Sequence, residues 1–572
     1  MRRDVGDEGV GRPCGRDRLV RLASPLSESS SGIRWIVSAK RSTYDRERFI
    51  PTGAFKKSIW ERTMRGRRFR KRFPLVLTIA LFSSVVALLS TGSASAQIVI
   101  RVPDDKPTIQ SAIDAAAAGD TVLVASGTYF ENINFRGKAI TVESDQGPEV
   151  TIIDGNLAGS VVTLASGEGP ASVLRGFTLQ RGDASGYYGS EGGGVRIERS
   201  SPTIQGNIIT NNRACGSGGG IEADFSSARI EDNLITNNGQ SLLCSGGIGG
   251  GIAVLAGQTQ VIDNIIVGNT WRSSSGGGIA LFGGTPIVRG NLIRANSAYD
   301  SGGGIDVSNS DALIVQNLII GNQAEQGGGI YFGVGDGERG PLLVNNTIAE
   351  NLGQGSGIFA VGFDAHAQLF NNVVVGASGQ SAIYCDPSFD PTPPVFMFNN
   401  VYTPDASAYG GICGDPTGTY GNISADPLFV DPLSNDYHLG SGSPSVDAGD
   451  NAAPDLPATD FDGDQRIIND RVDQGVDEYG VSAHRPGLPT NLTATRKQKT
   501  ATVSWSPPST DGGSQILSYS VSVSDGRIAT VDAAVTSVTF DGIRKKETYR
   551  FSVVATNAIG SSDPAFVTLR AG

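Results

Sequence analysis

The sequence has few charged and aromatic residues, little proline and almost no histidine. Charged residues make up 18% of its 572 positions, aromatic residues make up 7%, and there are three histidines. Helical bundles usually carry more charge than this, and the 27 prolines are too few for a collagen repeat. No CxxC or Cys/His spacing occurs among the five cysteines, which excludes the usual structural zinc sites and predicts no metal centre.

Glycine is in excess, because it accounts for 77 of the 572 residues, or about 13%, against a usual share of about 7%. A long, glycine-rich and charge-poor chain predicts many short strands joined by tight turns. Charge is unevenly divided, because residues 1–96 contain 20 basic and 8 acidic residues while the remainder contains 26 and 49. The acidic remainder argues against nucleic-acid binding and against charge-driven adhesion to anionic lipid.

The basic N-terminal part predicts export. Met64 begins a run of arginine and lysine, an apolar stretch extends from Phe73 to Leu89, and Ala94-Ser-Ala precedes Gln97. These are the three parts of a secretory signal peptide, with cleavage expected before Gln97. A transmembrane anchor is the alternative reading, since the apolar run approaches the ~20 residues that span a bilayer.

A signal peptide belongs at a true N-terminus. We therefore expect residues 1–63 to be an over-extended, disordered gene start and residues 64–96 to be the cleaved signal peptide. The mature protein is predicted to be secreted or held at the cell surface, without a membrane span, and to be a monomer.

A Gly-Gly-Gly-Ile/Val unit recurs along the chain with a period of 25 to 31 residues. Its aliphatic positions are Val195, Ile221, Ile252, Ile279, Ile305, Ile330, Ile358, Ile383 and Ile412. An asparagine follows in each unit, namely Asn207, Asn233, Asn264, Asn291, Asn317, Asn346, Asn372, Asn400 and Asn422. The apolar runs are too short for helical repeats, so each unit predicts one coil of a parallel β-solenoid.

Stacked coils lie about 4.8 Å apart, and this spacing explains the recurring residues. We expect the asparagines to occupy turns in the left-handed conformation, with their amides bonded from coil to coil. The triple glycines are expected where successive backbones pack too closely for Cβ atoms.

The cysteines predict two disulfides. Cys14 belongs to the leader, and four cysteines remain, for which three pairings exist. We expect Cys215 to pair with Cys244 and Cys385 with Cys413, because each pair lies near the same turn or strand of adjacent coils.

Both ends of the repeat resemble the pectate-lyase-like right-handed parallel β-helix. Val102-Pro-Asp-Asp-Lys-Pro-Thr-Ile-Gln-Ser-Ala-Ile-Asp-Ala-Ala is similar to the short helix that closes the first coil in this family, with Ile109, Ala112, Ile113 and Ala116 on one face. Gly442-Ser-Pro-Ser-Val-Asp-Ala-Gly-Asp resembles the closing segment of exported β-helix proteins. The resemblance implies an all-β chain with the β-helix over residues 97–480.

Residues 485–571 are similar to a fibronectin type III β-sandwich. The segment Thr-Val-Ser-Trp505 and the segment from Tyr549 to Gly560 carry the resemblance. It implies that Trp505 is the core tryptophan and Tyr549 the tyrosine corner, both packing residues.

The catalytic motifs of pectate lyases and polygalacturonases are missing. The chain has no Gly-His-Gly, Asn-Thr-Asp or Arg-Ile-Lys, and none of its three histidines lies in a catalytic context. If Val195 and its equivalents point inward, Glu222 and Asp224 point outward, about 6.6 Å apart along one strand. That spacing would allow an inverting glycosidase, so these two carboxylates are the candidate catalytic pair. An ion pair between Arg196 and Glu222 is the plainer expectation.

Four aromatic residues fall on outward strand positions of nearby coils: Phe282, Tyr331, Phe359 and Tyr384. Such a strip could stack on sugar rings, although loops or the tail could also cover it. Asp460-Phe-Asp-Gly-Asp464 could hold calcium weakly, but its glycine is fourth and not sixth as in an EF-hand loop. We therefore expect no cofactor.

The sequence thus favours a non-catalytic exported protein that binds a polysaccharide or another cell-surface partner. A lyase or hydrolase with an unfamiliar active site is one alternative, and a structural adhesin or spacer is another. An arginine or lysine facing a carboxylate cluster would favour the enzyme.

Overall fold

The computed structural model describes residues 97–185, 191–242, 244–335, 340–362, 367–388, 392–480, 485–512 and 514–570. The predicted leader, residues 1–96 with Cys14, lies outside the described residues, as do His366 and His484. Within the described part of the chain, no helix has the length and apolar character needed to cross a membrane.

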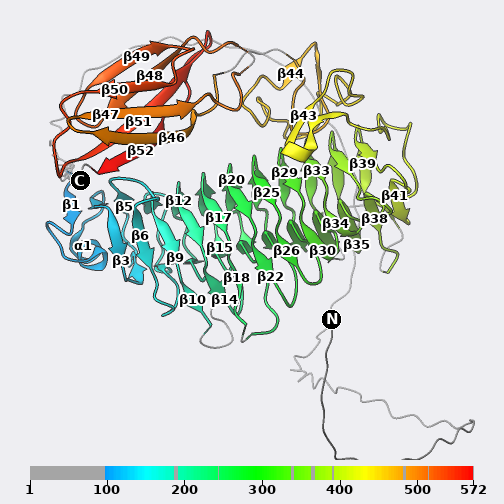
Figure 1. Ribbon diagram of the computed structural model, residues 1–572. Helices are drawn as coiled ribbons and strands as arrows, with labels where there is room; N and C mark the ends of the chain where they lie inside the picture. The colour runs from blue at the N-terminus through cyan, green and yellow to red at the C-terminus, as the bar shows by residue number, and fades with distance from the viewer. Residues whose placement is uncertain are drawn as a thin grey trace, which may run out of the picture. The chain divides into compact units, whose positions relative to one another are not determined.

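Three long parallel sheets of 12, 11 and 11 strands and a shorter one of seven form the predicted solenoid (Figure 1). One coil consists of β11 (Val195–Glu198), β12 (Thr203–Gln205), β13 (Ile208–Thr210) and β14 (Arg213–Ala214). Each strand pairs with its equivalent in the next coil, so that Val195 lies opposite Ile221 and Ile221 opposite Ile252. The sequence repeat therefore corresponds to the stacked coil.

The sheet that begins each unit is called the front sheet below. Its strands are β4 (Ile133–Asn134), β7 (Val162–Leu164), β11, β15 (Ile221–Ser226), β19 (Ile252–Gly257), β23 (Ile279–Phe282), β27 (Ile305–Ser308), β31 (Ile330–Val334), β35 (Ile358–Gly362), β38 (Ile383–Cys385) and β41 (Tyr409–Gly411). The aliphatic residues of the repeat from Val195 to Ile383 point inward and are fully buried in one continuous core. The expected position of Ile412 is wrong, because Tyr409 is the residue in register with Ile383 and Ile412 is only partly buried. Burial of these stacked rows is the main stabilising contribution.

Two buried asparagine ladders run through the coils. In the first, each side-chain amide donates to the carbonyl oxygen of the next asparagine, for example Asn291 Nδ2 to Asn317 Oδ1 at 2.9 Å. Its last members are Asn372, Asn399 and Asn422, so Asn399, and not Asn400, continues the ladder. The second ladder, absent from the sequence analysis, joins Asn212, Asn238, Asn269, Asn296, Asn322 and Asn351.

The expectation that the ladder asparagines adopt the left-handed conformation is wrong. The residue before each ladder asparagine adopts it instead. Gly206, Asp263 and Asn345, for example, have φ values of 62°, 54° and 50°. The asparagine itself points into the coil, because its amide satisfies backbone carbonyls that would otherwise be buried without a partner.

The triple glycines form an arch that lies against the outer side of the front sheet. A Cβ on Gly219 would lie 2.4 Å from Gly239 N, so the predicted close approach of backbones is confirmed. At Gly218, with φ of 62°, a Cβ would lie 2.7 Å from the Cβ of Glu222. In the units of Glu222 and Asp306, the arch therefore covers the first outward residue of the strand that follows it, whereas Arg196 and Tyr331 at the same position are only partly buried.

Helix α1 (Ile109–Ala115) is the predicted cap of the first coil, with Ile109, Ala112 and Ile113 buried. An acidic side chain lies at the N-terminal end of the helix and a basic side chain at its C-terminal end. Glu131 accepts the N–H groups of Ile109 and Gln110 at 2.9 Å, and Lys138 Nζ donates to three C-terminal carbonyls at 2.8 Å. These contacts complement the helix dipole and satisfy its terminal groups.

The parallel coils end earlier than residue 480. The last front strand ends at Gly411, and residues 429–479 instead form two small hairpins, β42 (Phe429–Asp431) with β43 (Asp436–Leu439) and β44 (Ile467–Ile468) with β45 (Arg471–Val472). This tail packs along the side of earlier coils, since Asn345 Nδ2 donates to Asp473 O and Val476 N to Thr347 Oγ1.

Residues 490–570 form two antiparallel sheets around a core of their own. One contains β46 (Thr490–Lys497), β47 (Thr500–Ser506) and β50 (Ser537–Phe540); the other contains β48 (Ser518–Val523), β49 (Ile528–Asp532), β51 (Thr548–Thr556) and β52 (Ala565–Arg570). Trp505 packs in this core, and Tyr549 Oη accepts the N–H of Arg544 at 3.2 Å. Both packing roles predicted from sequence are confirmed.

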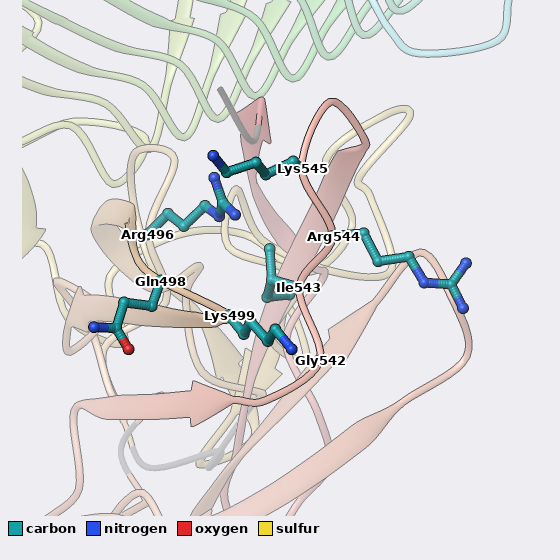
Figure 2. Close-up of a pocket in the computed structure, with 7 residues that line it drawn as sticks. All are labelled: Arg496, Gln498, Lys499, Gly542, Ile543, Arg544 and Lys545. Atoms are coloured by element: carbon teal, nitrogen blue, oxygen red, sulfur yellow. The ribbon is translucent and has the colours of Figure 1, made fainter.

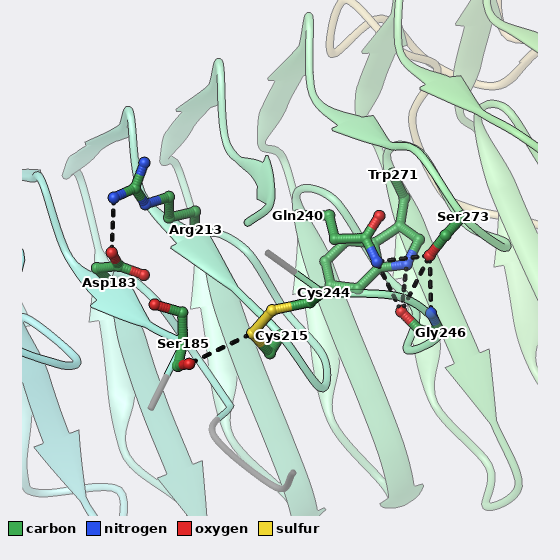
Figure 3. Close-up of a disulfide and its surroundings, with 9 residues drawn as sticks. All are labelled: Asp183, Ser185, Arg213, Cys215, Gln240, Cys244, Gly246, Trp271 and Ser273. Atoms are coloured by element: carbon green, nitrogen blue, oxygen red, sulfur yellow. Dashed lines mark hydrogen bonds and ion pairs between the residues drawn. A yellow bond between two sulfur atoms is a disulfide. The ribbon is translucent and has the colours of Figure 1, made fainter. Parts of the chain in front are cut away.

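Both predicted disulfides are present, with Cα separations of 5.3 Å for Cys215–Cys244 and 5.1 Å for Cys385–Cys413. Cys244 belongs to the longest repeat unit and ties its extra loop to the preceding coil (Figure 3). The loop also binds Trp271, whose indole N–H donates to Gly246 O at 3.2 Å. Trp271 is fully buried as a result.

Candidate functional site

The outward side chains of the front sheet form two rows that run from coil to coil. The register places Arg196, Glu222, Ala253, Ala280, Asp306, Tyr331, Phe359 and Tyr384 in the first row. The second row lies two residues further along each strand and contains Glu198, Asp224, Leu255, Phe282 and Ser308. The rows are those expected from alternation along a strand.

Glu222 is completely buried, although its side chain points away from the core. Its exposed fraction is 0%, and its carboxyl group forms a side-chain hydrogen bond with the carboxyl group of Glu191. Burial, followed by the nearby carboxylates of Glu191 and Asp224, raises the pKa of Glu222 far above its usual value of 4.5. The side chain is therefore protonated at neutral pH.

Asp224 lies in the second row and is half-buried. Burial and the charge of Glu198 raise its pKa. The expected ion pair between Arg196 and Glu222 is wrong, since Arg196 Nη2 instead binds Glu198 Oε2 at 2.6 Å. Arg196 and Glu198 share one strand and lie two residues apart, so both project from the same face.

This geometry does not favour the predicted catalytic pair. Glu222 has the raised pKa of a general acid. A general acid must also come within hydrogen-bond reach of its substrate, however, and the glycine arch covers Glu222. The arch, which the sequence analysis did not place over the strand, is the reason for this difference.

Three of the four predicted aromatic residues form a stack. The ring centroids of Tyr331 and Phe359 are 5.8 Å apart, and those of Phe359 and Tyr384 are 5.2 Å apart, with nearly parallel planes. Phe359 is 1% exposed, so the expectation that it lies open on the surface is wrong. Stacking occupies both faces of the Phe359 ring and one face each of the Tyr331 and Tyr384 rings.

Phe282 lies in the second row and not in this stack. It is 51% exposed, two coils beyond Asp224 and in register with Leu255. Phe225, which the sequence analysis missed, is 63% exposed and follows Asp224 directly. Its φ of 45° turns its side chain out of the strand alternation, and the Arg199 guanidinium lies 5.9 Å from its ring centre.

Phe225, Leu255 and Phe282, bordered by Asp224 and Arg199, are called the front patch below. In the sequence, the front patch is indicated only by an acidic residue and an aromatic residue at the adjacent positions 224 and 225. Alternation alone would have directed Phe225 into the core.

One group in the tail has the geometry of a metal site. His438, Asp462 and Asp477 place ligand atoms within 4.8 Å of one another. His438 Nδ1 also contacts Asp436 at 2.5 Å, and Nε2 contacts Asp462 at 2.9 Å. The hydrogen bond to Asp462 and the surrounding carboxylates raise the pKa of His438 to about 10, so the group is a charged cluster held by an imidazolium. The expectation of no cofactor stays a prediction.

Comparison with known families agrees with both folds. Residues 108–271 and 246–390 match the right-handed β-helix region, and residues 487–568 match the fibronectin type III domain.

Among solved structures, the chain is similar to the spore cortex lytic enzyme SleM of Clostridium perfringens, with 22% identity over 15% of this chain and 28% of that one, at a TM-score of 0.14. It is similar to domains d3-d4 of rat CD45, with 22% identity over 15% and 51%, at a TM-score of 0.14. It also matches titin domains A168-A170, with 25% identity over 17% and 35%, at 0.14. The chain spans between a quarter and about half of these proteins, and such TM-scores support no functional argument.

Proposed function

Because the chain is a right-handed β-helix protein with a C-terminal fibronectin type III domain, we propose that it binds an extended polysaccharide on the front sheet without cleaving it. The two domains suggest an extracellular, carbohydrate-related protein, and the disulfides are consistent with that location. The fold alone does not define a ligand, so the proposal depends on the surface.

The front patch is the observation that carries the proposal. It exposes two phenylalanine rings on one sheet face, and Phe225 lies beside Asp224 and Arg199. Aromatic rings supply apolar contact to the faces of sugar rings, while carboxylates and guanidinium groups bond their hydroxyls. This combination of apolar surface with a few polar groups is typical of ligand sites.

A ligand that runs along the coils would also reach the aromatic stack. Tyr331 lies two coils beyond Phe282, or about 10 Å at the usual spacing between strands. Tyr331 and Tyr384 would contact the polysaccharide with the edges of their rings, so both residues remain part of the proposed site. Phe359 would act by keeping the two tyrosines in place, since its own ring is buried.

Substitution of both exposed rings tests the proposal. A glycan array first identifies a ligand, and the affinity of Phe225→Ala with Phe282→Ala is then measured. Each ring is expected to contribute about 1 kcal/mol, so affinity should fall about tenfold or more. Phe130→Ala, an exposed phenylalanine outside the front sheet, is the matched control.

Two results would contradict the proposal. Unchanged affinity of the double variant, with an intact circular dichroism spectrum, would place binding elsewhere. Polymer cleavage that disappears in Glu222→Gln or Asp224→Asn, detected by reducing ends or by unsaturated uronate absorbance, would instead show an enzyme.

A further inference from the structure

The fibronectin type III domain contains a cleft lined by basic residues. Its volume is about 890 Å³, and its lining consists of Arg496, Gln498, Lys499, Gly542, Ile543, Arg544 and Lys545 (Figure 2). Arg496 belongs to β46, Gln498 and Lys499 to the turn before β47, and the other four to the loop between β50 and β51. Such a volume lies within the range of ligand pockets.

Hydrogen bonds hold the two sides of this cleft in place. Ile543 N donates to Lys499 O at 2.8 Å, which joins the loop to the turn. Arg544 N donates to the hydroxyl of Tyr549 at 3.2 Å, and Ile543 is buried in the domain core. The tyrosine corner that stabilises the sandwich therefore also fixes the basic loop. A cleft formed before binding loses less conformational entropy when a ligand arrives.

Positive charge is concentrated at this cleft. Six basic residues occupy the two short segments that border it: Arg496, Lys497, Lys499, Arg544, Lys545 and Lys546. Arg544 lies 3.5 Å from Glu547, and Figure 2 shows its side chain directed away from Arg496 and Lys545. Within the described part of the domain, neither Lys499 nor Lys545 forms an ion pair.

The remainder of the chain has the opposite charge. Residues 97–484 contain 16 basic and 43 acidic residues, whereas residues 485–570 contain ten and six. Cations gathered in one concave region raise the local potential and attract anions there. Because the domain does not neutralise Lys499 and Lys545 with its own carboxylates, the missing counter-charge points to an external anion.

We propose that this cleft binds an acidic polysaccharide through its carboxylate or sulfate groups. Lys499 and Lys545 contact the anionic groups. A single flexible chain can enter the cleft, whereas the acidic solenoid would repel a broad anionic surface such as a bilayer. This site lies on a different domain from the front patch and does not depend on it.

Dextran sulfate and neutral dextran of equal length test this site on the whole protein at physiological salt. Dextran sulfate should bind and neutral dextran should not. Lys499→Ala with Lys545→Ala should weaken binding of dextran sulfate at least tenfold, because each lysine loses a charge-assisted contact. Arg550→Ala with Arg570→Ala removes the same charge elsewhere in the domain and should change affinity less than twofold.

Three outcomes would overturn the proposal: no binding of dextran sulfate, equal losses in both double variants, or tighter binding of phosphatidylglycerol vesicles or duplex DNA. Circular dichroism checks that each variant is folded. Added salt should weaken the binding of dextran sulfate, and this dependence provides a second measurement that needs no variant. Phe225→Ala with Phe282→Ala should leave dextran sulfate binding unchanged, so this site and the front patch can fail separately.

Discussion

At the scale of the residue, the glycine arch decides what an outward side chain can do. Glu222 and Asp306 point away from the core, and both are buried beneath an arch. Asp306 nevertheless has partners, because Ser301 and Ser308 donate to it at 2.7 and 3.0 Å. The partner of Glu222 is a second acid, the carboxyl group of Glu191. The same position in the coil therefore holds a carboxyl group bonded to two hydroxyl groups in one unit and a carboxyl group kept protonated beside a second acid in another.

Glu222→Gln should stabilise the protein at alkaline pH. The folded state keeps Glu222 protonated while the unfolded state ionises it near 4.5, so stability falls as pH rises above that value. Glutamine cannot ionise and should remove this loss. The melting temperature of the variant should exceed that of the parent at pH 8 and match it at pH 4.5. A constant difference across this range would show that ionisation is not the cause.

His438→Gln should show the opposite dependence on pH. The pKa of His438 is raised in the folded protein, to about 10, so its ion pairs contribute fully below the unfolded value of 6.5 and are lost as pH rises through 10. The side chain is half exposed, which limits the effect to about 1 kcal/mol. Unfolding free energies at pH 6 and pH 10.5 should therefore differ between parent and variant only at the lower pH.

At the scale of the element, the asparagine ladders replace the hydrogen bonds that the turns cannot form. Asn291 donates to Val261 O, Arg289 O and Asn317 Oδ1, and it accepts from Asn264 N. Each asparagine thus connects three coils through buried groups. Such a chain of polar contacts fixes the register between coils, because a shifted coil would leave its amides without partners.

Asn291→Ala should therefore be costly. It leaves at least two buried backbone groups without partners, which is expected to reduce the free energy of unfolding by roughly 3 kcal/mol or more. Asn132→Ala, at an exposed position with one hydrogen bond, should cost less than about 1 kcal/mol. Urea titration of both variants measures the difference, and similar losses would contradict a special role for the ladder.

Removal of the Cys385–Cys413 disulfide should destabilise the final coils. The bridge closes a loop of 28 residues, for which chain entropy predicts a contribution of about 3–4 kcal/mol. Hydrogen exchange of Cys385→Ser with Cys413→Ser should show faster opening of β38 and β41 than of β11 and β15. Uniform exchange along the solenoid would argue against a local effect.

At the scale of the whole molecule, the two folded regions differ in charge. The solenoid and its tail carry an excess of acidic residues, and the fibronectin type III domain carries an excess of basic ones. Two surfaces of different chemistry, the front patch and the basic cleft, are thus present in one chain. We expect them to prefer different groups on their ligands.

Export is the prediction that concerns the whole chain. The basic, apolar and small-residue segments from Met64 to Ala96 predict cleavage before Gln97. N-terminal sequencing of protein recovered from the medium should begin at or within a few residues of Gln97. A sequence that begins inside residues 1–63 would refute both the cleavage and the assignment of Met64 as the initiator.

Periodic features were determined by the sequence itself. The spacing of Gly-Gly-Gly-Ile/Val predicted the coils and their register, and the positions of cysteines in that register predicted both disulfides. The capping helix, Trp505 and Tyr549 were predicted as well. These features follow from local patterns that repeat, because each coil meets its neighbour in the same way.

Only the tertiary structure decided which outward residues are accessible. The arch at Gly218 covers Glu222, the rings beside Phe359 enclose it, and a left-handed backbone at Phe225 turns that side chain outward. Alternation along a strand predicts the direction of a side chain but not which atoms cover it. Burial depends on how the preceding arch folds back over its own strand and on the rings of neighbouring coils, and alternation along the strand does not contain those contacts.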